Sequence, residues 1–209
     1  MTAGIHGVTL RRGVDHGNMT AHSSDQDPRA LVLDGDSQAS LTVARSLNER
    51  GVAIDVGSVE PGSIAAHSRH VATSFSHPDP AVSPEAFVDA VVKRLTTDEY
   101  EAVIPTRDDT TTVVAKYQDR LASTGATVGV EDWDRFRLVA DKARTFEIAS
   151  ELSVPTPHTR APESMAEVKS VAAEFSYPVV VKSRSKHVWA AGDRLDTQLV
   201  DDGHYADSP

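Results

Sequence analysis

Short apolar runs alternate with segments of helical periodicity between Arg29 and Val130. Brief apolar runs bounded by turn residues are typical of buried strands, whereas apolar residues repeated every three or four positions are typical of amphipathic helices. Strands and helices that alternate in this way form a parallel sheet covered on both faces. Residues 29–130 are therefore predicted to be a doubly wound, Rossmann-like α/β domain. The expected strands are 30–34, 52–56, 71–75, 102–105 and 126–130, and the expected helices are 39–50, 83–95 and 110–121.

The pattern changes from residue 131 onward, where strands become scarce. The segment Val154-Pro155-Thr156-Pro157 excludes helix, because proline lacks the amide hydrogen and restricts the residue before it. Residues 131–209 are predicted to be a second, smaller α+β unit. The expected elements are helices at 132–139, 142–152 and 164–175, and antiparallel strands at 178–182 and 188–191.

Two details of this second unit follow from the same pattern. The helix at 164–175 is expected to turn one apolar stripe toward a core. The stripe consists of Val168, Val171, Ala172 and Phe175. At the end of the sequence, Ser208 followed by Pro209 is a typical helix start, because serine is a common cap residue and proline suits the first helical position.

Residues 1–28 differ from both units, because they hold several glycines and little apolar periodicity. Such a segment buries too little apolar surface to offset the entropy of ordering, so a disordered lead-in is expected. The sequence contains no apolar run long enough to span a bilayer and no apolar targeting core, which predicts a cytoplasmic protein without a membrane partner.

Charge and composition narrow the classes of partner. The chain has 21 Lys and Arg against 31 Asp and Glu, a formal net charge of −10, and it has no cysteine. An acidic chain repels phosphate backbones, so nucleic acid is not an expected partner. The scarcity of lysine and the excess of aspartate favour adaptation to high salt, with an ordinary acidic protein as the alternative. Disulfides, thiolate metal sites and cysteine nucleophiles are excluded.

The turn after the first predicted strand reads Asp34-Gly35-Asp36-Ser37. A dinucleotide site would need two further glycines for the pyrophosphate to approach the backbone, and Asp36 would repel it. An NAD-dependent oxidoreductase is therefore a weak alternative. Capping of the following helix by Asp36 or Ser37 is the favoured interpretation.

The turn after the fourth predicted strand collects polar residues at the carboxyl end of a parallel strand, where open sheets bind ligands. Arg107 is suited to a carboxylate, and Asp108 or Asp109 to an amine. Capping of the next helix by Asp109 is an equally open alternative. The candidate substrate-binding residues are Thr106, Arg107, Asp108 and Asp109.

Two later segments carry a resemblance to a known superfamily. Asp141-Lys142 is predicted to open a helix, and beyond the Val154–Pro157 turn the strand Tyr177-Pro178-Val179-Val180-Val181 ends in Lys182. This order resembles the ATP-grasp superfamily, in particular its carboxylate-amine ligase-like members. The resemblance covers Arg29 to about Asp193 and implies that residues 29–130 are the substrate domain that precedes the ATP-grasp domain.

The resemblance also implies roles for individual residues. Both lysines of the pattern contact nucleotide phosphates in the family, so Lys142 and Lys182 are expected to bind ATP. Many members follow the second lysine with a glycine-rich loop, whereas this chain has Ser183-Arg184-Ser185-Lys186-His187. Ser183 and Ser185 are expected to contact phosphate through their hydroxyls, although backbone approach is less free than at glycine.

The family's adenine-binding hinge and its magnesium-binding Asp, Glu and Asn residues lie in a further lobe, and no metal ligand is assigned to this chain. The resemblance thus implies a truncated amino-terminal part of a carbon–nitrogen ligase, with ATP and Mg²⁺ used by an intact member and no turnover by this chain alone. A non-catalytic small-molecule-binding module is the main alternative. The identity of the carboxylate and the formation of homo-oligomers stay open.

Overall fold

The computed structural model describes residues 27–190, 194–197 and 205–208. The predicted lead-in, apart from Asp27 and Pro28, lies outside the described residues. Five parallel strands form the sheet of the first unit in the order β3-β2-β1-β4-β5. The strands are β1 (Arg29–Val32), β2 (Ala53–Ser58), β3 (Thr73–Ser76), β4 (Ala102–Ile104) and β5 (Thr127–Val128). The predicted doubly wound α/β architecture is confirmed.

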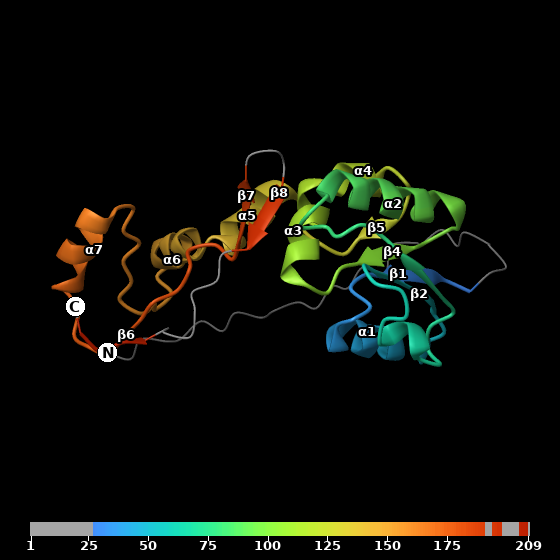
Figure 1. Ribbon diagram of the computed structural model, residues 1–209, viewed down its shortest axis with the longest axis horizontal. Coiled ribbons are helices and arrows are strands. Elements are labelled where there is room, and N and C mark those ends of the chain that lie inside the picture. Colours follow the sequence, from blue (N-terminus) through green and yellow to red (C-terminus); the bar gives the residue numbers. More distant parts are fainter. Residues whose placement is uncertain (1–26, 191–193, 198–204, 209) are drawn as a thin grey trace, which may run out of the picture.

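Helices cover both faces of this sheet (Figure 1). One face carries α1 (Gln38–Asn48) and the short 3-10 helix η1 (Ala65–His67). The other face carries α2 (Pro84–Thr97), α3 (Asp108–Lys116) and α4 (Gln118–Ala122). Ser83 precedes α2 as predicted, but its side chain makes no capping hydrogen bond, so the proline at the first helical turn is the remaining start signal.

Alternating residues of β1 divide the core into two clusters, because successive strand side chains point to opposite faces. Ala30 and Val32 pack toward α1 and η1, whereas Leu31 and the following Leu33 pack toward α2, α3 and α4. All of these strand residues are at most 3% exposed. Two-sided burial explains why β1 is a continuous apolar run in the sequence.

The helix predicted at 110–121 is divided at Tyr117, whose ψ of 22° ends α3 and starts α4. Side chains spaced four apart along this predicted helix keep their burial across the break, since Val113 and Leu121 are fully buried. Three successive threonines weaken the helix here, because Thr111 and Thr112 donate their hydroxyls to carbonyls one turn back. Tertiary burial therefore fixes the side chains while the backbone changes direction.

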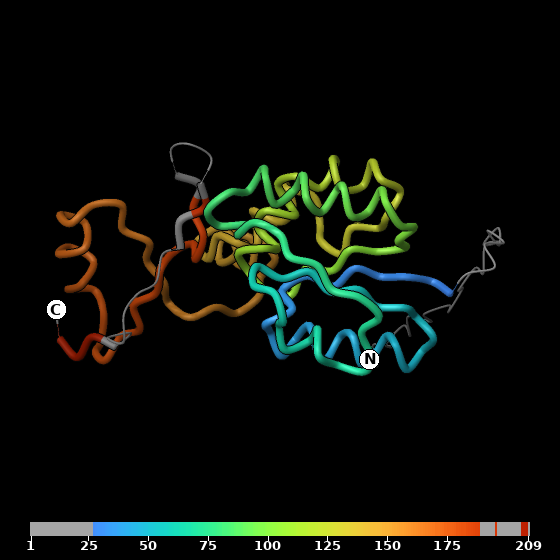
Figure 2. Tube along the Cα trace, turned by 45° about the vertical axis from the view of Figure 1, so that its right-hand side comes forward, coloured from blue at the N-terminus to red at the C-terminus, as the bar shows by residue number. Residues whose placement is uncertain are grey.

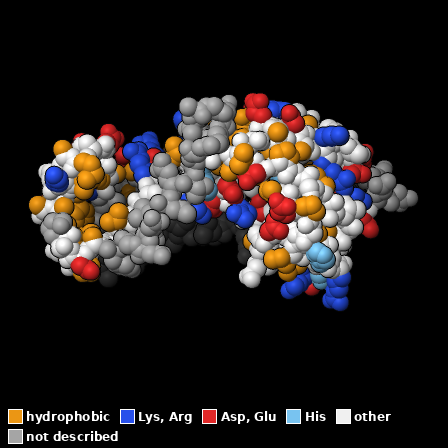
Figure 3. Space-filling model, in the orientation of Figure 1, with side chains coloured by type: hydrophobic (Ala, Val, Ile, Leu, Met, Phe, Trp, Pro, Cys, Tyr) orange, Lys and Arg blue, Asp and Glu red, His pale blue; other side chains and the backbone are white. Residues whose placement is uncertain are grey.

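The second unit contains α5 (Trp133–Ala140), α6 (Lys142–Glu151) and α7 (Met165–Ala172), close to the predicted helices. None of these three helices has a buried residue. The predicted inward stripe of α7 reaches no buried core in this structure, because Val168 is 40% exposed and Val171, Ala172 and Phe175 are only partly buried. Figure 3 shows apolar side chains on the surface of this part of the molecule.

The predicted pairing of the strands near the end of the chain is also wrong. Strand β6 (Val179–Val180) pairs antiparallel with β9 (Tyr205–Ala206), not with residues 188–191. Strand β7 (His187–Ala190) instead forms a hairpin with β8 (Arg194–Thr197). Tyr205 and Ala206 are thus extended just where the sequence suggested the approach to a helix, and Pro209 lies outside the described residues.

The β7–β8 hairpin connects the two units. Leu195 of β8 is 3% exposed and belongs to the core cluster beneath α2 and α3. Its backbone N–H donates to the carbonyl of Ala81 over 3.1 Å. Figures 1 and 2 both place this hairpin beside the sheet domain, with α7 and β6 at the far end of the molecule. In the described part of the chain, no helix has the length and apolar character needed to cross a membrane.

Candidate functional site

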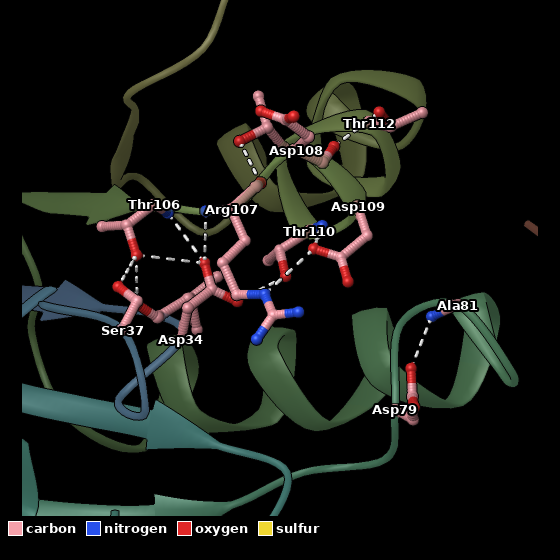
Figure 4. Close-up of polar contacts among 12 residues, drawn as sticks. Asp34, Ser37, Asp79, Ala81, Thr106, Arg107, Asp108, Asp109, Thr110 and Thr112 are labelled. Atoms are coloured by element: carbon pink, nitrogen blue, oxygen red, sulfur yellow. Dashed lines mark hydrogen bonds and ion pairs between the residues drawn. The ribbon is translucent and has the colours of Figure 1, made fainter. Parts of the chain in front are cut away.

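The candidate site lies at the carboxyl ends of β1 and β4, the adjacent strands at which the chain's direction of progress through the sheet reverses. Ligands of open α/β sheets bind at such positions. The turn between β4 and α3 supplies Thr106 and Arg107, and the first turn of α3 supplies Asp108 and Asp109 (Figure 4).

Asp34 fixes the backbone of this turn from the adjacent strand end. Its Oδ2 accepts the N–H groups of Thr106 at 2.7 Å and Arg107 at 2.9 Å, and its Oδ1 accepts the hydroxyl of Thr110. The residue has a left-handed φ of 65° and is 7% exposed. Burial raises the pKa of Asp34, although the hydrogen bonds from Thr110, Thr106 and Arg107 oppose that rise.

Ser37 joins the β1 turn to the β4 turn. Its Oγ lies 2.9 Å from Oγ1 of Thr106 and also accepts the N–H of Ser40, which confirms Ser37 as the predicted cap of α1. Gly35 is required here, because a Cβ at this position would lie 2.4 Å from Oγ of Ser63 and 2.6 Å from Cγ1 of Val56. Protein atoms therefore fill the space next to this turn.

The four predicted substrate residues differ in what they present outward. Thr106 uses its hydroxyl internally, whereas the side chain of Arg107 is 56% exposed, with its Nε 3.5 Å from Oδ1 of Asp109. Helix α3 begins at Asp108 with Arg107 as its cap residue, and no side chain completes a cap. Capping by Asp109 is therefore wrong, but both aspartates lie in the first turn, where the helix dipole favours negative charge.

Across the junction, the second unit brings together two of the four predicted phosphate ligands, Lys142 and Ser183. Asp141 caps α6 by accepting the N–H groups of Ala143 and Arg144. Lys142 donates its Nζ to the carbonyl of Ser183 over 2.8 Å and its backbone N–H to the carbonyl of Arg184 over 3.0 Å. Arg184 in turn pairs with Asp141 at 2.9 Å. The loop after β6 is thus attached to the amino end of α6.

The same loop reaches the substrate turn. Nζ of Lys186 lies 2.7 Å from Oδ2 of Asp108, with side chains 50% and 66% exposed, respectively. The hydrogen bond from Lys186 lowers the pKa of Asp108, and the charges of His187 and Lys142 lower it further despite partial burial. Figure 3 shows acidic and basic side chains gathered at this junction. The loop that contains Ser183 and Ser185 therefore contacts the predicted substrate turn through Lys186.

Lys182 and Ser185 are less firmly placed by the structure. Lys182 is exposed two residues after β6, and within the described residues it has no hydrogen bond or ion pair. Ser185 is partly buried in the loop between Arg184 and Lys186. Whether these side chains contact phosphate stays a prediction.

The sequence did not identify Asp34 as the residue that organises the substrate turn. The available signal was a carboxylate placed immediately after the apolar run of β1, at the strand end where sites form. Among the described residues, no group of three or more His, Asp or Glu side chains could hold a metal ion.

Comparison with known proteins places this geometry in a fold family. No protein-family model matches the sequence, and no curated protein is significantly similar to it. Solved structures do match. The biotin carboxylase domain of Hydrogenobacter thermophilus 2-oxoglutarate carboxylase, in complex with MgADP, ADP and bicarbonate, is 22% identical with a TM-score of 0.56, over 76% of this chain and 35% of that chain.

Two other matches have different substrates in their names. N5-carboxyaminoimidazole ribonucleotide synthetase from Thermotoga maritima is 14% identical with a TM-score of 0.56, over 81% of this chain and 40% of that chain. L-amino acid ligase from Bacillus licheniformis is 12% identical with a TM-score of 0.59, over 85% of this chain and 40% of that chain. This chain therefore shares its fold with these enzymes over part of their length, and it spans less than half the length of these solved structures.

Proposed function

We propose that this chain supplies the substrate domain and the beginning of the ATP-binding domain of an ATP-dependent carboxylate-amine ligase. One observation carries the proposal: Lys186, from the loop expected to contact phosphate, lies 2.7 Å from Asp108 on the turn expected to contact substrate. A ligase of this kind needs its phosphoryl donor and its acceptor carboxylate at adjoining positions. The junction provides that proximity.

The proposed reaction has two steps. A substrate carboxylate oxygen attacks the γ-phosphorus of ATP, the bond to the β,γ-bridging oxygen breaks, and ADP leaves. An amine then attacks the acyl carbon, the bond from this carbon to the phosphate oxygen breaks, and phosphate leaves while the nitrogen loses a proton. The positive charges of Lys142 and Lys182 would stabilise the transferring phosphoryl group, and hydroxyls of Ser183 and Ser185 would donate to its oxygens.

On the acceptor side, Arg107 would hold the carboxylate through two parallel N–H donors. Asp108 or Asp109 would attract a cationic amine and orient it toward the acyl group. Asp34 would keep the turn in place through the backbone of Thr106 and Arg107. No residue of this chain is assigned to magnesium; its use by an intact protein is part of the proposal.

We expect weak nucleotide binding and no ligase activity from residues 1–209 alone. Two partly exposed lysine–phosphate contacts would contribute about 1 to 3 kcal/mol each. Immobilising a nucleotide costs several kcal/mol, so the expected affinity is at best millimolar. A chain extended by the adenine-binding and metal-binding lobe should bind ATP in a magnesium-dependent manner.

Titration calorimetry with a non-hydrolysable ATP analogue tests the proposal on both the short and the extended chain. Lys142→Ala and Lys182→Ala should each remove most of the binding by the extended chain. Lys169→Ala is the matched control, because Lys169 lies exposed on α7 and should leave binding unchanged. Tight binding by the short chain, or indifference of the extended chain to both substitutions, would show that these lysines are wrongly assigned.

The same assay separates the alternatives. Binding of small carboxylates without any nucleotide would support a non-catalytic binding module, and binding of NAD would support an oxidoreductase. The 2-oxoglutarate carboxylase domain is a dimer in its solved structure. Self-association of this chain is a proposal that its mass in solution tests.

A further inference from the structure

Lys186 and Asp108 form an ion pair between the two units, 78 positions apart in the sequence. Asp108 belongs to the first turn of α3, so its position is set by a packed helix. Lys186 instead belongs to the loop between β6 and β7, and its ammonium group is carried on a flexible four-carbon side chain. The acid is thus the fixed partner and the lysine the movable one.

The pair is weak enough to be exchanged. Both side chains are at least half exposed, and ion pairs of this kind contribute little because water screens them and both side chains lose freedom. A polyphosphate offers an ammonium several negative charges, whereas Asp108 offers one. Lys186 also follows Ser183, whose carbonyl already accepts from Lys142. A polyphosphate held at Lys142 would therefore bind close to a lysine whose present partner is weak.

We propose that Lys186 exchanges partners: it neutralises Asp108 in this structure, and a polyphosphate bound beside Lys142 withdraws it, which frees Asp108 for the cationic amine of the second substrate. The inference rests on the proposed function and deepens it by assigning Asp108 to the amine. Because coupling between two sites is reciprocal, polyphosphate and amine each strengthen the binding of the other. The ion pair thereby disfavours capture of the amine before the phosphoryl donor is present.

Asp109 provides a matched control for charge. It is the next residue in the same helical turn, but its carboxylate lies 3.5 Å from Arg107 and has no contact with Lys186. Asp108→Asn and Asp109→Asn remove the same charge from almost the same place. Only the first of them releases Lys186.

The experiment measures the affinity of the full chain for inorganic tripolyphosphate by titration calorimetry at low salt. Asp108→Asn should bind about two- to fivefold more tightly than the wild type, the range that an exposed ion pair supplies. Asp109→Asn should show a smaller gain. In a Lys186→Gln background the effect of Asp108→Asn should fall to that of Asp109→Asn. Equal gains for the two aspartate variants, or a gain by Asp108→Asn that survives loss of Lys186, would overturn the exchange.

A second readout follows the carboxyl group itself. Carbon-13 NMR of Asp108 should show its pKa rising when tripolyphosphate is added, because the lysine that lowers it has left. In Lys186→Gln the pKa should already be higher without tripolyphosphate, and adding tripolyphosphate should raise it by less than in the wild type, because only the negative charge of the ligand then acts. An unchanged pKa in the presence of bound tripolyphosphate would refute the exchange alone. Absence of tripolyphosphate and ATP binding in every variant would overturn both the exchange and the proposed function.

Discussion

The hydroxyl of Thr110 donates to Oδ1 of Asp34, a contact that joins α3 to the end of β1 across 76 sequence positions. The other carboxylate oxygen accepts two backbone N–H groups of the β4 turn. Three donors from one turn therefore converge on one buried acid. The position of Arg107 and Asp108 depends on this acid, although neither side chain contacts it.

Two substitutions of Asp34 should show whether its hydrogen-bond acceptors or its negative charge stabilise the fold. Asp34→Ala leaves the N–H groups of Thr106 and Arg107 without an acceptor in a buried turn, so a loss of roughly 2 to 4 kcal/mol in the free energy of unfolding is expected. Asp34→Asn keeps one oxygen for these two donors, and its NH₂ group can donate to the Thr110 hydroxyl. The asparagine variant should stay within about 1 kcal/mol of the wild type in urea denaturation. Equal losses for the two variants would contradict this role.

The raised pKa of Asp34 determines how the contribution of this residue to the free energy of unfolding changes with pH. Burial raises its folded pKa above the unfolded value of 3.8, so the folded state binds the proton more readily. The stability that this group contributes is present below 3.8 and is lost as pH rises through the raised folded pKa. Urea midpoints should therefore fall for the wild type relative to Asp34→Asn between about pH 4 and pH 7. A widening advantage of the wild type over this interval would be inconsistent with a buried, destabilised carboxylate.

The contribution of Asp55 to stability is expected to depend on pH in the opposite direction. It is fully buried in β2, and although burial raises its pKa, hydrogen bonds from Tyr100, Thr73 and Arg94 and the charge of Arg29 together lower it. Its contribution to stability is thus present above 3.8 and is lost as pH falls through the lowered folded pKa.

Tyr100→Phe tests this network, because the Tyr100 hydroxyl donates to Oδ2 of Asp55 over 2.6 Å. A loss of about 1 to 3 kcal/mol is expected at pH 7, measured by urea denaturation. The difference from the wild type should shrink on acidification as Asp55 becomes protonated. Tyr177→Phe, which removes a hydroxyl that donates to the carbonyl of Ala172 in the second unit, is the tyrosine control, and a pH-dependent loss as large as that of Tyr100→Phe would show that the effect is not specific to Asp55.

The charge balance predicts salt-dependent folding. A net charge of −10 destabilises the compact state by repulsion at low salt, and molar salt screens this repulsion. Circular dichroism during thermal unfolding should show a higher melting temperature at about 2 M than at about 50 mM sodium chloride. A chain that is fully folded at the lower concentration and gains nothing at the higher one would argue for an ordinary acidic protein.

Two shortened chains, one that begins at Asp27 and one that begins at Arg29, should differ in stability. A chain that begins at Asp27 should match the full chain within about 0.5 kcal/mol if the first residues add no packing. A chain that begins at Arg29 also loses the Pro28 carbonyl, which accepts the N–H of Ala53 at 2.8 Å, and should be less stable by about 0.5 to 1.5 kcal/mol. A clear loss of melting temperature already in the first chain would show that residues 1–26 pack on the domain.

The sequence pattern was sufficient to predict the parallel sheet, because strands buried on both faces leave continuous apolar runs such as that around Leu31. It was also sufficient to predict Ser37 as one of two candidate caps of α1, because its side chain acts within its own helix turn, and to predict that a helix opens at Asp141-Lys142. It was insufficient for β9 and for the pairing of β9 with β6, although a strand at 178–182 was predicted. Two-residue strands have no periodicity, and their pairing depends on backbone hydrogen bonds between positions 179–180 and 205–206.

The candidate site, like the fold, was predictable from the sequence only in part. The polar turn at 106–109 was predictable because parallel strands place their carboxyl ends at one edge. The convergence of Asp34 on that turn was not, because in a sequence a buried acid looks identical to an exposed cap residue. The pairing of Lys186 with Asp108 likewise leaves no local pattern, since it depends on how the two units meet.

Leu195 has a consequence for the order in which the protein acquires its structure during synthesis. The core beneath α2 and α3 contains this side chain, yet the strands and helices that surround it are complete by residue 128. A nascent chain that has released only the sheet domain from the ribosome therefore has an incomplete apolar core. The full set of contacts in that core requires β8, so it forms only when the second unit docks on the sheet domain.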